Sequence, residues 1–245
     1  MSASLKSLLF ALGLCVVCSL FLTAASSGLR PWQERNALID RHRNILSAAG
    51  LVQEGRSYPA AEIERLYRER IRPLRVDPAG KVLEEPDSAQ SAAGLPIYLT
   101  VEEDDVRGYI IPIESRGVWG PIQGYLALDR DGKTVKGFAV YQHSETPGLG
   151  GEIEKKWFRE NWVGKKIATR EGKFVSVGIA KGRTEAEVPE EKRPHYVDGI
   201  SGATLTGKYL AAGIKDTLGR YEPVSVMFRK NQLAALGLPS TAASP

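Results

Sequence analysis

The stretch GYLALDRDGKTVKGFAVYQH, residues 124–143, is the clearest structural signal in the chain. Two runs rich in β-branched, aromatic and other apolar residues flank the pair Asp131-Gly132. An Asp-Gly pair suits a tight turn in which the glycine takes a positive φ. The stretch therefore predicts a β-hairpin, and with it a sheet whose strands are largely antiparallel.

Downstream of the hairpin, helical and extended patterns alternate. GGEIEKKWFRENWVGKKI, residues 150–167, predicts a helix, and KFVSVGIAKG, residues 173–182, predicts a strand. The stretch after residue 204 predicts a final helix. The expected apolar positions are Ile153, Trp157 and Trp162 in the first helix, Val175, Val177 and Ile179 in the strand, and Leu210, Ile214 and Leu218 in the last helix.

Upstream of the hairpin, residues 34–51 and 59–74 predict two helices, with Pro59 near the first turn of the second. Residues 77–96 are rich in Pro, Ala, Ser and Gly and predict a linker or a long surface loop. Short strand-like runs begin at Ile97. Mixed hairpins and helices of this kind indicate an α+β fold with flanking helices.

Charge and composition narrow the function classes. The 245 residues include 33 basic and 29 acidic side chains, for a net charge of +4, and the two signs are interleaved along the chain. A protein with nucleic acid as its main partner would more often carry a basic block. The composition argues against nucleic acid, and the small positive excess suits an anionic cofactor or lipid headgroups.

The apolar run Ser7–Leu29 has 23 residues without a charge and is long enough to cross a bilayer as a helix. A cleaved signal peptide is the alternative, because small residues follow Thr23, but the run exceeds the usual signal core of ~7 to 15 residues. We expect a retained anchor. Cys15 and Cys18 lie inside this run and are interpreted as small apolar helix residues; the rest of the chain has no cysteine to form a disulfide.

The sequence gives little support for a hydrolase site or a metal site. The three histidines are scattered, and no Gly-x-Ser-x-Gly elbow of a serine hydrolase occurs. The acidic run Glu102-Glu103-Asp104-Asp105 lacks the spacing of a calcium loop and is interpreted as a solvated turn. We expect no catalytic residues and no metal ligands.

Two short stretches can hold a ligand. HSETPGLGGE, residues 143–152, places glycines between a strand and a helix, where backbone N–H groups can approach a ligand, although turn geometry alone would also explain them. DGISGATLTG, residues 198–207, precedes the last helix. A phosphate on Thr204 would meet the unpaired N–H groups of that helix; the simpler interpretation is that Ser201 or Thr204 caps it.

DGISGAT, Asp198 to Thr204, resembles the flavinylation motif of the FMN-binding domain family: an acidic residue, two spacers, Ser or Thr, Gly, Ala and Thr. The wider chain resembles the C subunits of sodium-translocating NADH:quinone reductases almost from end to end. The single anchor is followed by further matching stretches: GLRPWQERN, NILSAAGL, GVWGPIQGYLALDRDGKTVKG, ETPGLGGE, WVGKK and DGISGATLT. Gly207 departs from the pattern, where Ser is expected.

The resemblance implies one membrane helix and an exported FMN-binding domain that transfers electrons. It implies FMN joined through its phosphate to Thr204 by a flavin transferase, with Thr206 the nearest alternative acceptor. Asp198 and Ser201 would help the transferase recognise the segment, and Gly202 and Ala203 would leave room for the phosphate. The remaining expected flavin neighbours are Glu145, Thr146, Leu149, Gly150 and, equally well explained as a core residue, Trp119.

The resemblance also implies an assembly. The chain would be an electron carrier, not catalytic alone, among other membrane subunits that move electrons from NADH toward ubiquinone with Na⁺ export. The anchor would occupy residues 1–30 of the inner membrane, followed by a helical segment and linker at 31–96, a periplasmic FMN-binding domain at 97–236 and a tail at 237–245. Two alternatives are the flavoprotein subunit of the Rnf ferredoxin:NAD complex and a membrane-anchored binding module without flavin.

Overall fold

The structure is a computed structural model that describes residues 3–53, 55–83, 94–103 and 105–233. The chain forms two compact units, residues 1–41 and 42–245. Helix α1 (Ala3–Ala48) is continuous, so the apolar run Ser7–Leu29 and most of the helix predicted over residues 34–51 belong to one helix. Pro31 lies inside α1, where it removes one backbone N–H. The predicted tail at 237–245 lies outside the described residues.

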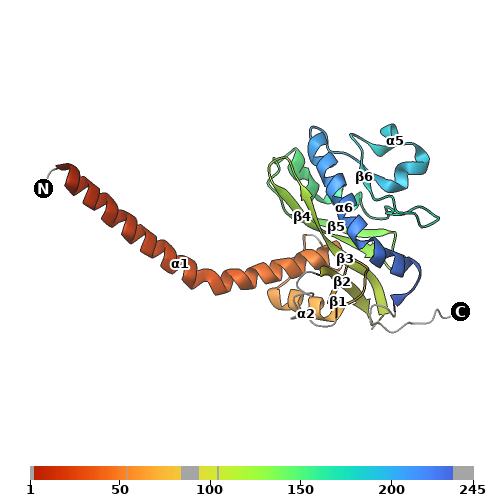
Figure 1. The fold of residues 1–245 in the computed structure, drawn as a ribbon, viewed down its shortest axis with the longest axis horizontal. Helices are drawn as coiled ribbons and strands as arrows, with labels where there is room; N and C mark the ends of the chain where they lie inside the picture. Colours follow the sequence, from red (N-terminus) through yellow and green to blue (C-terminus); the bar gives the residue numbers. More distant parts are fainter. Residues whose placement is uncertain (1–2, 54, 84–93, 104, 234–245) are drawn as a thin grey trace. The chain divides into compact units, whose positions relative to one another are not determined.

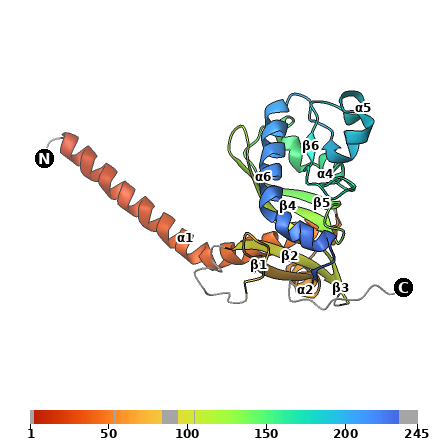
Figure 2. The ribbon, with the colours of Figure 1, turned by 45° about the vertical axis from the view of Figure 1, so that its right-hand side comes forward.

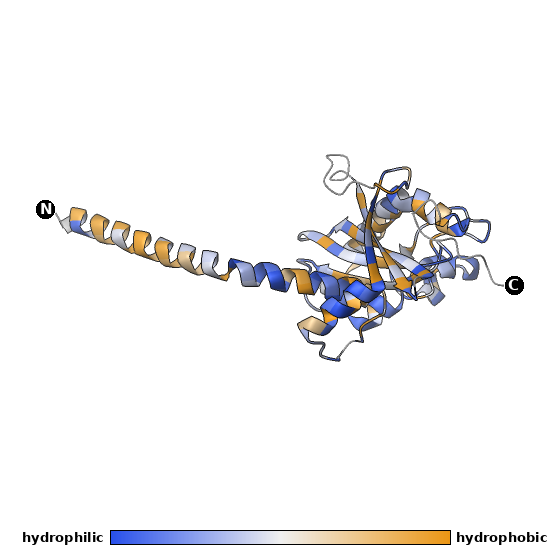
Figure 3. Ribbon diagram, turned by 90° about the horizontal axis from the view of Figure 1, so that it is seen from below, coloured by the Kyte–Doolittle hydropathy of each residue, from blue (hydrophilic) through white to orange (hydrophobic). Residues whose placement is uncertain are grey.

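The N-terminal part of α1 is strongly apolar, whereas its later turns are polar, as the hydropathy colours of Figure 3 show. Among the described residues, α1 is the one helix long and apolar enough to cross a membrane by length and composition. The leucines and phenylalanines from Leu5 to Leu29 are exposed, with Phe10 and Phe21 more than 70% exposed. Such exposure is compatible with a lipid environment.

The second unit is built on a five-stranded antiparallel sheet with the strands in chain order (Figure 1). The strands are β1 (Ile71–Val76), β2 (Leu95–Glu102), β3 (Asp105–Arg116), β4 (Pro121–Asp129) and β5 (Val135–Gln142). The predicted hairpin is confirmed as β4 and β5, with Tyr125 opposite Ala139 and Gly132 at a φ of 63° in the turn. The chain is therefore an α+β protein with an antiparallel sheet.

Helix α6 (Thr204–Arg229) lies across one face of the sheet, as both Figure 1 and Figure 2 show. Leu210, Ile214 and Leu218 are fully buried, which confirms the predicted apolar face. The helix is also tied to β3 by a hydrogen bond of 2.7 Å between the Tyr109 hydroxyl and Ser225 Oγ. Burial raises the pKa of Tyr109, so this hydroxyl keeps its proton and the bond persists at neutral pH.

The other face of the sheet is covered near β5 and β2. The carbonyl of Ala48 approaches Gly137 so closely that a side chain at 137 would collide with it, and α2 (Ala60–Arg70) packs beside β2 through the buried Ile63. Because both faces are covered, five consecutive positions of β4, from Gly124 to Leu128, are buried and do not alternate.

The helix predicted over residues 59–74 is too long. It ends at Arg70, and β1 begins at Ile71, which pairs with Thr100 of β2. Pro73 is tolerated in β1 because this is an edge strand. Strand β2 likewise begins inside the stretch expected to be a linker, of which residues 84–93 lie outside the described part.

The segment between β5 and α6 is more irregular than predicted. It contains two 3₁₀ helices, two short α-helices and a two-stranded parallel sheet, namely η1 (Gly150–Glu154), α4 (Lys156–Glu160), β6 (Gly178–Ile179), α5 (Thr184–Glu187), η2 (Glu190–His195) and β7 (Tyr196–Val197). The acidic run at 102–105 falls at the β2–β3 turn, where Glu102 pairs with Arg70 and Arg107.

The single helix predicted over 150–167 is interrupted at Lys155, which has an extended backbone with φ −72° and ψ 148°. The interruption shifts the buried face by one residue, so Phe158 is buried and Trp157 is 44% exposed. Trp162 and Ile153 are buried as expected.

The strand predicted over 173–182 is reduced to Gly178–Ile179. Ser176 has a φ of 70°, which breaks the alternation of an extended strand and leaves Val175 39% exposed beside the buried Val177.

Candidate flavin site

A cavity of about 290 Å³ lies where three separate segments meet: the β3–β4 turn, the loop after β5 and the first turn of α6. Its walls are formed by Val118, Trp119, Glu145, Thr146, Leu149, Gly150, Gly202, Ala203, Thr204, Leu205 and Thr206. Eight of the ten predicted site residues are therefore brought to one cavity. Asp198 and Ser201 are not part of its wall.

Thr204 and Thr206 are two residues apart but have different environments. Thr204 is the first residue of α6 and is exposed, so its hydroxyl can be reached from solvent. Thr206 is only 2% exposed, and its Oγ1 donates a hydrogen bond of 2.5 Å to Glu145 Oε2. Of the two hydroxyls, only that of Thr204 is available to a modifying enzyme.

The N-terminus of α6 is not closed by a side chain. Ala203 occupies the N-cap position, and no side chain of the described residues makes a capping hydrogen bond there. The simpler interpretation, that Ser201 or Thr204 caps the helix, is therefore wrong. The first intrahelical bond runs from the N–H of Gly207 to the carbonyl of Ala203, so the N–H groups of the first turn remain available to a ligand.

Glu145 holds the three segments together. Its side chain is 5% exposed. One carboxylate oxygen accepts hydrogen bonds from the backbone N–H groups of Val118, at 2.8 Å, and Trp119, at 3.1 Å, and the other accepts from Thr206. Glu145 was expected as a flavin contact, but the structure also shows it as the link between the β3–β4 turn and α6.

Gly150 is required at the centre of this link. A Cβ atom at position 150 would lie 2.6 Å from both Glu145 Oε2 and Thr206 Oγ1. A side chain would therefore push apart the groups that form the cavity floor. The sequence singled out this glycine through the family motif, but the contact that requires it depends on residues 61 positions apart.

The rim of the cavity is apolar and open. Trp119 is 72% exposed, Leu205 is 55% exposed and Leu149 is 44% exposed. The interpretation of Trp119 as a core tryptophan is wrong, because its side chain lies at the surface beside the cavity. Exposed aromatic and aliphatic groups around a small cavity can contact a flat apolar ring.

Asp198 supports the loop that leads into α6. Its Oδ1 accepts hydrogen bonds from the backbone N–H and the hydroxyl of Thr184, at 2.8 and 2.7 Å. Partial burial acts to raise the pKa of Asp198, but these hydrogen bonds and the nearby Lys165 and Arg183 outweigh it and lower the pKa. Ser201 is exposed, one position before Gly202, which has a φ of 76°.

The walls fit a flavin phosphate. The cavity combines a reachable hydroxyl, an open helix N-terminus and small residues at 202 and 203, which is the donor set that a phosphate ester needs. The apolar rim supplies the surface that an aromatic ring needs.

Comparison with known proteins agrees with this geometry. Residues 117–219 match the FMN-binding domain family. A Yersinia pestis protein, named as the C subunit of a Na(+)-translocating NADH-quinone reductase, is 36% identical over 229 residues, which cover 82% of this chain and 83% of that protein. A Pseudomonas aeruginosa protein of the same name is 35% identical, covering 83% of this chain and 87% of its own length.

Two solved structures have a similar fold. The C subunit of a Na(+)-translocating NADH-quinone reductase from Parabacteroides distasonis aligns with a TM-score of 0.68 and 30% identity over 80% of this chain and 96% of its own. A Shewanella oneidensis protein named NqrC aligns with a TM-score of 0.60 and 25% identity over 83% and 99% of the two chains.

Proposed function

This chain belongs to the family of the C subunits of Na(+)-translocating NADH-quinone reductases, an oxidoreductase complex with further subunits, and we propose that it carries covalent FMN on Thr204 and transfers electrons within that complex. The observation that best supports the attachment is the position of Thr204. Its hydroxyl is the exposed one at the uncapped start of a 26-residue helix, on the wall of the cavity described above. These comparisons favour the quinone reductase over the Rnf flavoprotein and over a flavin-free module.

The attachment forms a bond between Thr204 Oγ1 and the phosphorus of the flavin phosphate. The flavin comes from an activated phosphoanhydride donor such as a flavin dinucleotide, whose P–O–P bond breaks. The nucleoside monophosphate leaves and takes up the hydroxyl proton, so the net addition to the chain is one FMN less one water. A flavin transferase performs the step, with Asp198 and Ser201 presenting the segment to it. The free N–H groups of the first turn of α6 then stabilise the negative charge of the phosphoester.

The remaining wall residues orient the cofactor and exclude water. Glu145 keeps the β3–β4 turn against α6, so that Trp119 and Leu149 lie on two sides of the cavity mouth. Thr146 and Gly150 form the loop side of the wall. FMN supplies one-electron and two-electron chemistry when bound, and the protein tunes its potential through contacts to the ring.

The anchor defines how the chain acts in the complex. The apolar run Ser7–Leu29 holds the FMN domain at the periplasmic side of the inner membrane as a single-pass helix. This run contains no charged residue, so the chain offers no intramembrane ligand for Na⁺. Its contribution to Na⁺ export is electron transfer toward ubiquinone, with the ion path in the other membrane subunits.

The test is the intact mass of the denatured full-length protein, made with an active flavin transferase, followed by peptide mapping. We expect a gain of one FMN less one water on the peptide that contains Thr204. Thr204→Ala should abolish this gain while unfolding at nearly the same temperature, because the exposed side chain makes no hydrogen bond among the described residues. Thr206→Ser is the matched control and should keep the flavin.

Two outcomes would contradict the proposal. Retention of the added mass in Thr204→Ala would move the attachment to another residue. An unmodified wild-type mass, with the transferase active on a second substrate, would leave a membrane-anchored binding module as the better interpretation.

A further inference from the structure

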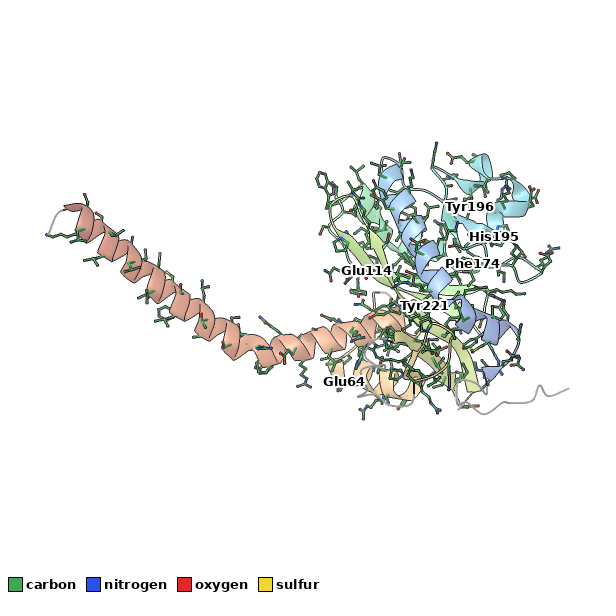
Figure 4. The ribbon with its side chains drawn as sticks, in the orientation of Figure 1. Glu64, Glu114, Phe174, His195, Tyr196 and Tyr221 are labelled. Atoms are coloured by element: carbon green, nitrogen blue, oxygen red, sulfur yellow. The ribbon has the colours of Figure 1, made fainter. Side chains whose placement is uncertain are left out.

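A second cavity, of about 570 Å³, lies along a later part of α6. It is bounded by residues 169–178, by η2 with β7, and by α6 itself, and its walls are Thr169, Val175, Ser176, Val177, Gly178, Glu191, Lys192, His195, Tyr196, Ala211, Ala212 and Lys215. Figure 4 labels His195 and Tyr196 beside α6. None of these residues belongs to the flavin cavity, and the proposed flavin attachment does not require them.

Ser176 in this wall is both strained and unsatisfied. Its φ of 70° is a left-handed conformation that a residue with a side chain rarely adopts. The residue is only 4% exposed, and Oγ has no hydrogen-bond partner among the described residues. The backbone is held there because the N–H groups of Val175 and Ser176 both donate to the carbonyl of Ile167. Strained residues of this kind are concentrated at ligand sites.

The charge of the cavity wall is positive. Lys192 and Lys215 are exposed at the wall, and neither has a carboxylate within ion-pair distance in the described ranges. His195 Nδ1 donates to the carbonyl of Lys166 at 2.7 Å, which fixes the position of this ring in the wall. Glu191 is the one acidic residue of the wall. Two lysines against one glutamate favour an anionic ligand.

Part of the wall is apolar. Val175, Val177 and Ala211 provide aliphatic surface. The ring of Tyr196 packs on Gly178, where a Cβ atom would lie 2.6 Å from the ring. An aromatic surface opposite small aliphatic residues accommodates a planar ligand.

We propose that this cavity binds a small aromatic carboxylate. The ring lies between Tyr196 and the small residues of α6, and Lys215 binds the carboxylate. Ala211 is seven positions after Thr204, so the cavity is about 10 Å along the helix from the flavin attachment at ~1.5 Å per residue. The two sites thus share one helix.

The test compares two fluorinated probes on the full chain in detergent, 6-fluoro-2-naphthoate and the uncharged 6-fluoro-2-naphthalenemethanol, by broadening of their ¹⁹F NMR signals. Micelles without protein give the background. We expect saturable broadening of the carboxylate, and Lys215→Met should weaken its binding about tenfold or more, because a charge-assisted contact is lost. The same substitution should change the binding of the alcohol by less than about twofold. Lys208→Met, on α6 outside this wall, is the matched control and should leave both signals unchanged.

Two further variants separate a ligand site from a purely structural role. Ala211→Phe fills the cavity and should abolish the broadening of both probes. Ser176→Gly relieves the left-handed strain while it removes the hydroxyl, so it should weaken carboxylate binding without lowering the unfolding temperature by more than a few degrees. Absence of protein-dependent broadening with the wild-type chain would overturn the proposal. Equal binding of the acid and the alcohol, unaffected by Lys215→Met, would overturn its ligand class.

Discussion

The five-stranded sheet and the segment from Gly150 to Ala203 are stabilised in different ways. The sheet is a continuous ladder in which each strand pairs with its neighbour in chain order. The segment has only one pair of two-residue strands and several helices of four to six residues. It keeps its shape through single contacts, such as the hydrogen bonds of Thr184 to Asp198 and of His195 to the carbonyl of Lys166.

This difference has a functional consequence. Residues of the segment contribute to both cavities, Gly150, Gly202 and Ala203 to the first and Ser176 with His195 to the second. Loops positioned by a rigid scaffold commonly carry binding sites. Single substitutions at the anchoring side chains of the segment should therefore disturb the sites more than comparable changes in the exposed parts of the same segment.

The largest effect is expected at Phe158. Its ring is fully buried and packs edge-on against the stacked rings of Phe138 and Trp162, whereas the neighbouring Trp157 is 44% exposed. Phe158→Ala should lower the free energy of unfolding by about 3–5 kcal/mol, because it leaves a cavity in the core. Trp157→Ala should cost less than about 1 kcal/mol. Urea unfolding of the full chain measures both, and equal losses would show that Phe158 does not anchor the segment.

A smaller effect is expected from Gly150→Ala. The added methyl group must displace Glu145 or Thr206, which should cost about 1–3 kcal/mol and reduce flavin incorporation. Gly148→Ala is the matched control: position 148 has a φ of 76° but open space around it, so only backbone strain of about 1 kcal/mol is added. Chemical unfolding and the fraction of chains with added flavin mass should separate the two variants. If the two variants lost equal stability and incorporated equal flavin, Gly150 would be needed only for the geometry of its turn.

The same contrast explains what the sequence could predict. The hairpin at 124–143 and the buried face of α6 follow from local periodicity and turn chemistry, and both are confirmed. The interruption at Lys155 and the left-handed Ser176 result from contacts with distant residues, so local patterns extended a helix and a strand through them. The end of α2 at Arg70 was missed because pairing of β1 with β2 outweighed helical spacing.

The candidate site was predictable only in part. Its residues at 145–150 and 198–204 came from the resemblance to a family motif, and the structure brings most of them to one cavity. The bond between Glu145 and Thr206 has no signal in the sequence, because it joins the loop after β5 to the first turn of α6 and the fold sets the distance between them. Ser176 likewise looked like an ordinary position in a strand.

The smallest effect is expected in the five-stranded sheet, at the turn between β4 and β5. Asp131 Oδ1 accepts hydrogen bonds from the N–H groups of Lys133 and Thr134, and Oδ2 accepts from the Thr134 hydroxyl. Partial burial acts to raise the pKa of Asp131, but these bonds and Lys166 outweigh it, so its pKa is lowered. Asp131→Ala should cost about 1–2 kcal/mol at pH 7.

That cost should depend on pH in a defined direction. Because the folded pKa lies below the unfolded value of about 3.9, the stabilisation is complete above about pH 5 and is lost as the pH falls through the folded pKa. The difference between wild type and Asp131→Ala should therefore shrink as the pH falls below about 4 in urea unfolding curves. Asp216→Ala, an exposed position on α6, should show almost no difference at any pH. Only the carboxylate form of Asp131 is stabilised by these three donors. If the difference in the free energy of unfolding between wild type and Asp131→Ala stayed constant with pH, the lost stability would instead come from turn propensity.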